Sequence, residues 1–235
     1  MRATKRIIVV GGDKGGVGKS FVARALLHYL REINVDVLAV DTDPSNATFA
    51  SFLRGKLPCE LVNIDVETAL DTLFNKVLEH GTVLVDFAAR AHERFAKWVE
   101  DVDLGSLQKG YGVELTMFFV LGGEPESVAI LNDVYQKTAT DTHLVIVRNM
   151  GRTENFKFYE NHPVRAAVLD RGAAEIEIPE LASHLAQLLA QRKLLFHEAM
   201  DKQLPDPLTP MDQNRASRFT KLAAEQFDQV GEFLN

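Results

Sequence analysis

Cysteine is almost missing from this sequence, and that narrows the chemistry open to it. Cys59 is the single cysteine in 235 residues, so the chain cannot form an internal disulfide. The sequence also lacks an apolar run of about 18 residues and a charged segment followed by an apolar one, so we expect neither a membrane span nor a signal peptide. Together these features predict a protein of the reducing cytoplasm.

An excess of positive charge is missing as well. The 26 Lys and Arg residues are outnumbered by 33 Asp and Glu residues, which gives a net charge of −7. Such a chain has no general attraction to nucleic acid or anionic lipid, so DNA binding would need a local basic patch or a partner protein, and we favour the partner. The seven histidines and Cys59 lack the spacing of metal ligands.

Short apolar runs that alternate with helical segments dominate what is present. "RIIVV", "VDVLAV", "TVLVDF" and "HLVIVRN" are apolar on both faces, as strands of a covered parallel sheet are, and "VELTMFFVLG" and "AEIEIP" are two further candidates. Residues 22–33, 66–80 and 124–139 have helical periodicity. This alternation predicts an α/β fold: a doubly wound, mainly parallel sheet with helices on both faces.

We expect one domain over residues 1–235, because its length and its 46% hydrophobic content suit a single α/β core. A proline-rich stretch, 203–212, is the only linker-like segment, and a helix over 213–234 should follow it. Basic residues are confined to the first turns of that helix and acidic residues follow, so we expect its apolar stripe to pack on the core rather than bind a membrane. The stripe consists of Phe219, Leu222, Ala223, Phe227 and Val230.

A phosphate-binding loop is the strongest chemical signal. "GGVGKS" forms the end of the pattern G-x-x-x-x-G-K-[ST] and lies where the physics requires it, after a strand and at the start of a helix. We expect Lys19 to contact the β- and γ-phosphates of ATP and the Ser20 hydroxyl to bind Mg²⁺. A glycine turn made only for tight packing is the alternative. The expected nucleotide-binding segment is Gly15, Gly16, Val17, Gly18, Lys19 and Ser20.

A second lysine distinguishes this loop from the ordinary one. Asp13 occupies the first glycine position of the pattern, and Lys14 precedes the glycines, so "KGGVGKS" resembles the deviant Walker A motif K-G-G-x-G-K-[ST] of the ParA/MinD family of ATPases. The resemblance implies that Lys14 reaches across the interface of an ATP-dependent homodimer to the nucleotide of the other subunit. There it would offset charge on the transferring phosphoryl group. The alternative is a solvated loop charge.

Carboxylates follow two of the predicted strands. "VLAVDTDPSNATFA" resembles the D-x-D-P segment of the family, which implies that Asp43 orients the hydrolytic water and that Asp41 lies near the metal; a strand-to-turn cap is the alternative. Asp86 ends "TVLVD", where the family has the Walker B carboxylate that holds Mg²⁺ through water. Phe87, Ala88 and Ala89 follow it, where relatives often have proline or glycine.

Weaker signals concern the base. Asn149 follows a strand and is similar to the asparagine that reads adenine in the family, and Pro179 is similar to the proline of its base-packing loop. Ordinary turns are the alternative for both residues, and Arg148 could equally be a surface charge. Phe21 stands where many relatives carry a hydroxyl that helps with the α-phosphate, so we assign it no nucleotide role.

The stretch from "DTDPSNATFASF" to "VDFAARAHERF" resembles plasmid-encoded conjugation and stability ATPases of the TraL/StbB type within this family. This implies a role in plasmid transfer, stability or positioning, with a partner that binds DNA; direct DNA binding is left open. We expect a slow, partner-stimulated ATPase in which Lys14, Lys19 and Asp43 are catalytic. A non-hydrolysing nucleotide-binding adaptor and a biosynthetic enzyme with the same loop are the alternatives.

Overall fold

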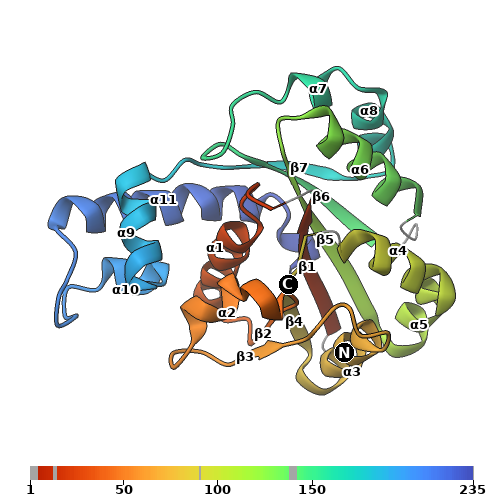
Figure 1. The fold of residues 1–235 in the computed structure, drawn as a ribbon, viewed down its shortest axis with the longest axis horizontal. Helices are drawn as coiled ribbons and strands as arrows, with labels where there is room; N and C mark the ends of the chain where they lie inside the picture. Colours follow the sequence, from red (N-terminus) through yellow and green to blue (C-terminus); the bar gives the residue numbers. More distant parts are fainter. Residues whose placement is uncertain (1–4, 13–14, 90, 138–141, 235) are drawn as a thin grey trace.

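A seven-stranded parallel sheet forms the centre of the molecule (Figure 1). The computed structural model describes residues 5–12, 15–89, 91–137 and 142–234. The strand order is β3-β2-β4-β1-β5-β6-β7, and every pair of neighbouring strands is parallel. The strands are β1 Lys5–Gly12, β2 Leu38–Asp41, β3 Cys59–Leu61, β4 Thr82–Asp86, β5 Val113–Leu121, β6 Thr142–Asn149 and β7 Ala174–Ile178.

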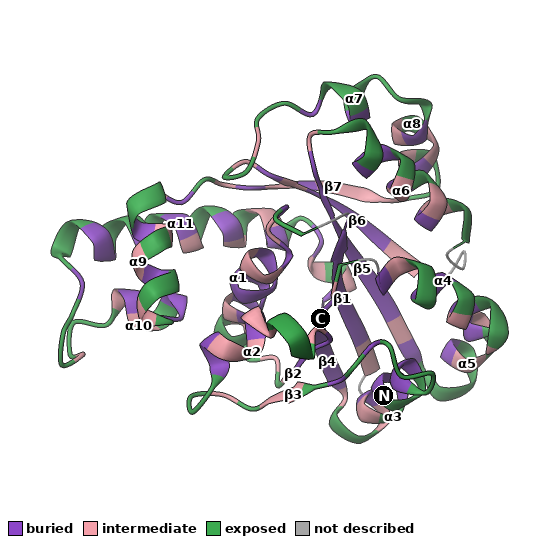
Figure 2. Ribbon diagram, viewed as in Figure 1, coloured by how far each residue is buried: buried purple, intermediate pink, exposed green. Residues whose placement is uncertain are grey.

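Helices cover both faces of this sheet, because side chains of its central strands alternate between two apolar clusters. Ile8 and Val10 of β1 belong to the cluster under α1, α2, α9, α10 and α11, whereas Ile7 and Val9 belong to the cluster under α3 to α8. The central strands are buried, whereas the edge strand β3 is partly exposed, and the helices expose their outer surfaces (Figure 2). The predicted fold class is therefore confirmed. The helices are α1 Lys19–Glu32, α2 Thr48–Leu53, α3 Ala69–His80, α4 Ala91–Asp101, α5 Leu104–Tyr111, α6 Pro125–Lys137, α7 Lys157–Glu160, α8 Pro163–Asp170, α9 Ser183–Arg192, α10 Phe196–Met200 and α11 Pro210–Asp228.

The last helix begins earlier than the sequence predicts. α11 runs over Pro210–Asp228, and a 3₁₀ turn, Gly231–Phe233, follows it. Pro210 occupies the first turn, where no backbone N–H is needed, and the Thr209 side chain caps the helix by accepting from the Asp212 N–H. The predicted linker 203–212 therefore ends in helix. Four residues of the predicted stripe are buried against the core, as expected, while Leu222 is exposed; the buried ones are Phe219, Ala223, Phe227 and Val230.

Helices α9, α10 and the first half of α11 project beside the sheet, next to α1 (Figure 1). Aromatic side chains join them to the first turn of α1: the Phe21 ring lies 5.8 Å from Phe196 of α10 and 5.3 Å from Phe219 of α11. The Phe196 and Phe219 rings stack at 5.0 Å. This cluster holds the projecting helices against the start of α1. No described helix combines the length and the apolar character that a bilayer crossing requires.

Candidate nucleotide site

The loop between β1 and α1 follows the central strand of the sheet. Gly16 and Gly18 have φ values of +97° and +100°, which L side chains rarely adopt. Gly18 is the N-cap of α1 and supplies no side chain to cap it. No side chain caps the start of α1, and the helix dipole favours an anion at this end.

Asn149, at the end of β6, holds this loop in place. Its carboxamide donates to the Val17 carbonyl oxygen (3.0 Å) and accepts from the Gly151 N–H (3.3 Å). A Cβ on Gly18 would lie 2.2 Å from Nδ2 of Asn149, so only glycine fits beside it. Asn149 is 2% exposed. The polar atoms of Asn149 therefore hold the glycine loop in place. A contact of Asn149 with adenine remains a prediction.

Asp86, at the end of β4, lies beneath the loop with its charge poorly compensated. Its side chain is buried, and Oδ1 has no hydrogen-bond partner within the described part of the chain. Burial raises the pKa of Asp86 to about 7; the Ser20 hydroxyl, which hydrogen bonds to it, and the cations Lys19 and Arg24 oppose this rise, while Asp41 adds to it. A buried carboxylate with a free oxygen next to a serine hydroxyl fits an Mg²⁺ site.

Asp41 and Asp43 have structural partners. The two oxygens of Asp41 accept from the backbone N–H groups of Asp43 and Ala50, both at 3.0 Å, so this carboxylate fixes the segment that leads into α2. Oδ1 of Asp43 accepts from the Ser45 hydroxyl (2.6 Å) and the Asn46 N–H (3.0 Å) and caps a 3₁₀ turn, Pro44–Asn46. Both contacts are those of a strand-to-turn cap. The metal role of Asp41 and the catalytic role of Asp43 remain predictions.

Two adjoining clefts open above these residues. The first has a volume of about 440 Å³ and is lined by the glycine loop, Lys19, Ser20, Asp43 and Asp86; it is called the phosphate-side cleft after the group that the loop is predicted to bind. The second has a volume of about 340 Å³ and is lined by Asn149, Gly151, Leu181, Ser183 and Gln187; it is called the base-side cleft after the predicted contact of Asn149 with adenine. The basic residues of the first cleft suit the anionic end of a ligand, and the mostly uncharged lining of the second suits a less charged end. Four residues line both clefts: Phe21, Arg152, Ala186 and Ala190.

Residues 8–147 match the family described as the CobQ/CobB/MinD/ParA nucleotide binding domain. The chain belongs to this family. It is 27% identical to the MobD protein of Acidithiobacillus ferrooxidans over 207 residues, which cover 86% of this chain and 88% of MobD. It is 30% identical to the TraL protein of Escherichia coli over 124 residues, 50% of this chain and 51% of TraL.

Solved structures of MinD have the same fold as this member of the MinD/ParA family. MinD from the MinC:MinD complex of Aquifex aeolicus is 15% identical, with a TM-score of 0.51 and coverage of 95% of this chain and 96% of that one. MinD of Pyrococcus horikoshii, complexed with Mg-ADP, is 18% identical, with a TM-score of 0.50 and coverage of 98% of both chains. These likenesses concern the fold.

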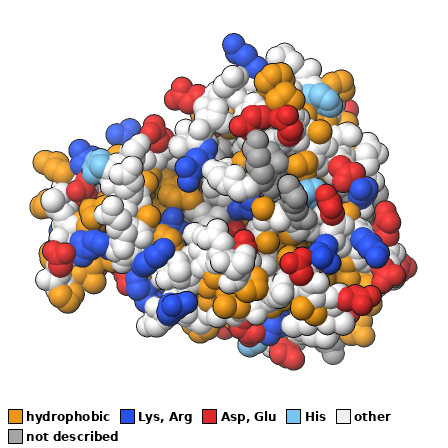
Figure 3. Space-filling view, in the orientation of Figure 1, with side chains coloured by type: hydrophobic (Ala, Val, Ile, Leu, Met, Phe, Trp, Pro, Cys, Tyr) orange, Lys and Arg blue, Asp and Glu red, His pale blue; other side chains and the backbone are white. Residues whose placement is uncertain are grey.

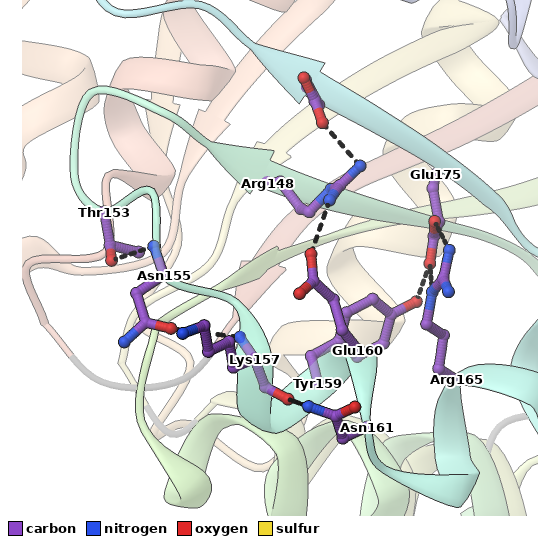
Figure 4. A network of polar contacts seen from close by, with 10 residues as sticks. Arg148, Thr153, Asn155, Lys157, Tyr159, Glu160, Asn161, Arg165 and Glu175 are labelled. Carbon is purple, nitrogen blue, oxygen red and sulfur yellow. Dashed lines mark hydrogen bonds and ion pairs between the residues drawn. The ribbon is translucent and has the colours of Figure 1, made fainter.

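The structure brings most of the predicted residues of this family member to one place. The glycines, Lys19, Ser20, Asp41, Asp43 and Asp86 line the phosphate-side cleft, and Asn149 lines the base-side cleft. Pro179 lines neither of the two clefts, whereas Leu181, two residues later, lines the base-side cleft. Lys14 lies outside the described residues. Arg148 is half-buried and forms ion pairs with Glu160 (3.3 Å; Figure 4) and Glu177 (2.6 Å).

Several residues that line the clefts belong to no sequence motif. The Arg24 guanidinium lies 3.6 Å from the centre of the Phe52 ring, and Nζ of Lys193 lies 4.8 Å from it, so one ring is in contact with two cations that line the phosphate-side cleft. Arg152 lines both clefts. These basic residues come from α1, from the end of α9 and from the loop after β6, and only folding brings them together.

The residues present fit a magnesium nucleotide. Among the described residues, no group of three or more His, Cys, Asp or Glu side chains could hold a metal ion by itself. An ion held jointly by the Ser20 hydroxyl, by Asp86 through water and by phosphate oxygens needs no such group. When bound, the ion would neutralise phosphate charge, and the free Oδ1 of Asp86 supplies an acceptor for its water ligands.

Proposed function

We propose that this protein binds ATP with Mg²⁺ and hydrolyses it slowly, as a homodimeric switch that acts through a partner protein. One observation carries the proposal: the uncapped start of α1 lies beside Ser20 and the buried, incompletely paired Asp86. The helix end attracts phosphate and the carboxylate attracts a cation, so the two together favour a magnesium nucleotide over either ion alone.

The proposed roles follow the chemistry of each side chain. Lys19 binds the β- and γ-phosphates, Ser20 and Asp86 hold the metal, and Asp43 orients the attacking water. Lys14 of one subunit adds its charge to the nucleotide of the other, so turnover requires two subunits. Slow turnover suits a switch, because the ATP-bound dimer must persist long enough to engage its partner.

The proposed role concerns a plasmid, and the proposed location of the protein is the reducing cytoplasm. The similarity to TraL and the TraL/StbB-type stretch support a role in plasmid transfer, stability or positioning. A partner protein would supply contact with DNA, because the chain has a net charge of −7 and the face seen in Figure 3 intersperses acidic with basic side chains. Transfer or partition genes beside the gene would agree with this setting, and a biosynthetic operon would argue for a small-molecule enzyme.

Phosphate release measured with and without candidate partner proteins tests hydrolysis. We expect slow release that a partner accelerates, and we expect Asp43→Ala to abolish release while ATP still binds, because Asp43 acts only in the transition state. The second candidate is a non-hydrolysing adaptor, favoured by the capping contacts of Asp43. Nucleotide binding without any release, alone or with partners, would support the adaptor and contradict the ATPase.

A further inference from the structure

The residues that line both clefts mark the passage between them, and they offer few polar side chains to a ligand. Phe21 of α1 lines both clefts, and so do Ala186 and Ala190, which are one turn apart on α9. Arg152 is the fourth residue that lines both clefts. Of the four, only Arg152 can donate a side-chain hydrogen bond or carry charge. A ligand that spans both clefts therefore meets a single polar side chain where it crosses.

Arg152 is fixed at its backbone, and its head group is available. Its N–H donates to the Asn149 carbonyl oxygen (3.0 Å) in the turn after β6, and a Cβ on Gly18 would lie 3.6 Å from Cγ of Arg152. The stem thus starts beside the glycine loop. In the described part of the chain the guanidinium makes no hydrogen bond or ion pair, whereas Arg148, on the same segment, is held by Glu160 and Glu177 (Figure 4).

We propose that Arg152 binds the phosphate nearest the ribose, the α-phosphate, of the nucleotide held by its own subunit. This inference rests on the proposed function. If the terminal phosphates occupy the glycine loop and the base lies beside Asn149 and Leu181, the α-phosphate is the charged group that falls in the passage. A guanidinium forms paired hydrogen bonds with phosphate oxygens, and Phe21 and the two alanines offer those oxygens no competing side-chain donor.

The test compares nucleotide affinities of Arg152→Ala and Arg152→Lys with the parent protein by calorimetry, using ATP and ADP with Mg²⁺. Arg152→Ala should weaken both nucleotides by the same factor, about tenfold to a hundredfold, as expected for a lost charge-assisted hydrogen bond. Arg152→Lys should restore part of the loss, because it keeps the charge without the fork. Arg218→Ala, which removes another exposed positive charge, on α11, is the matched control and should bind as the parent does.

Thermal unfolding without ligand separates binding from folding: the Arg152 variants should unfold at the parent temperature, because the side chain is exposed. A parent that binds neither nucleotide overturns the proposed function and this inference with it. A parent that binds both, with Arg152→Ala within twofold of it, overturns this inference alone. A variant weakened for ATP but not for ADP does so as well, since it would place Arg152 on the terminal phosphate.

Discussion

Asp41 and Asp86 are register partners at the ends of the paired strands β2 and β4, yet their carboxylates are satisfied to opposite degrees. Asp41 accepts backbone hydrogen bonds at both oxygens, whereas Oδ1 of Asp86 has no partner among the described residues. Two aspartates in equivalent positions of the sheet thus differ in their hydrogen bonding. Asp41 shapes the chain that enters α2, and Asp86 is left for a ligand.

Asp86→Asn should stabilise the ligand-free protein, and more so at higher pH. The pKa of Asp86 is about 7 in the folded protein against an ordinary value of 3.8. Between these values the unfolded chain has lost a proton that the folded protein keeps, so the free energy of unfolding falls as pH rises through this window. At about 1.4 kcal/mol for each pKa unit, the penalty reaches several kcal/mol above pH 7. Denaturant unfolding at pH 5 and pH 8 measures it.

Asp41→Asn is the matched control and should act in the opposite direction. A carboxamide has one acceptor oxygen and one NH₂ group, so it cannot accept from both the Asp43 and the Ala50 N–H, and a loss of about 1–3 kcal/mol is expected. The raised pKa of Asp86 would be contradicted if Asp86→Asn destabilised the ligand-free protein at pH 8, or if it stabilised the protein equally at pH 5 and pH 8.

Gly18→Ala should disrupt the loop, whereas Gly15→Ala should not. A Cβ at Gly18 would lie 2.2 Å from Nδ2 of Asn149, and an alanine there would have to keep a φ of +100°. A Cβ at Gly15 would meet no atom within 4 Å. We expect Gly18→Ala to lower the free energy of unfolding by about 1–3 kcal/mol, through backbone strain and the broken contact to Val17, and to weaken ATP binding. Thermal unfolding of the two variants, side by side, gives the comparison. Equal stabilities would mean that Asn149 does not brace the loop.

Lys14→Ala should separate nucleotide binding from dimerisation. Each monomer should still bind ATP through Lys19 and the backbone amides, but ATP should no longer assemble two subunits, because the charge that crosses the interface is gone. Light scattering on an ATP-saturated Asp43→Ala background, with and without Lys14→Ala, measures the assembly. A doubly substituted protein that still dimerises with ATP would make Lys14 an ordinary loop charge.

The sheet was predictable where its strands are apolar, and only there. All six apolar runs form strands, because a strand covered on both faces must be hydrophobic. β3, Cys59–Leu61, gave no such signal: it is a three-residue edge strand whose Leu61 is exposed and whose Glu60 forms an ion pair with Lys76. The sequence does not reveal the start of α11, because Pro210 resembles a linker residue although it suits a first helical turn.

The candidate site divides in the same way. Local motifs predict those cleft residues that a loop, a strand end or a spacing defines, namely Gly15, Gly16, Gly18, Lys19, Ser20, Asp43 and Asp86; Val17, in the same loop, lines neither cleft. Arg24, Arg152 and Lys193 belong to no motif and reach the clefts only through tertiary packing. Phe21 shows how packing changes a role: its ring joins α1 to α10 and α11, and it also lines the passage between the clefts.

Calorimetric titration of ATP with Mg²⁺ into the parent protein and Lys19→Ala is the most direct measurement of all. Lys19 is buried at the first position of α1, within the phosphate-side cleft. Removing it leaves phosphate charge without its main cation, so binding should be abolished, while Lys97→Ala, on the exposed face of α4, should bind as the parent does. The predicted result is ATP binding by the parent and by Lys97→Ala and none by Lys19→Ala; equal binding by all three proteins would contradict the assignment of this loop to a nucleotide.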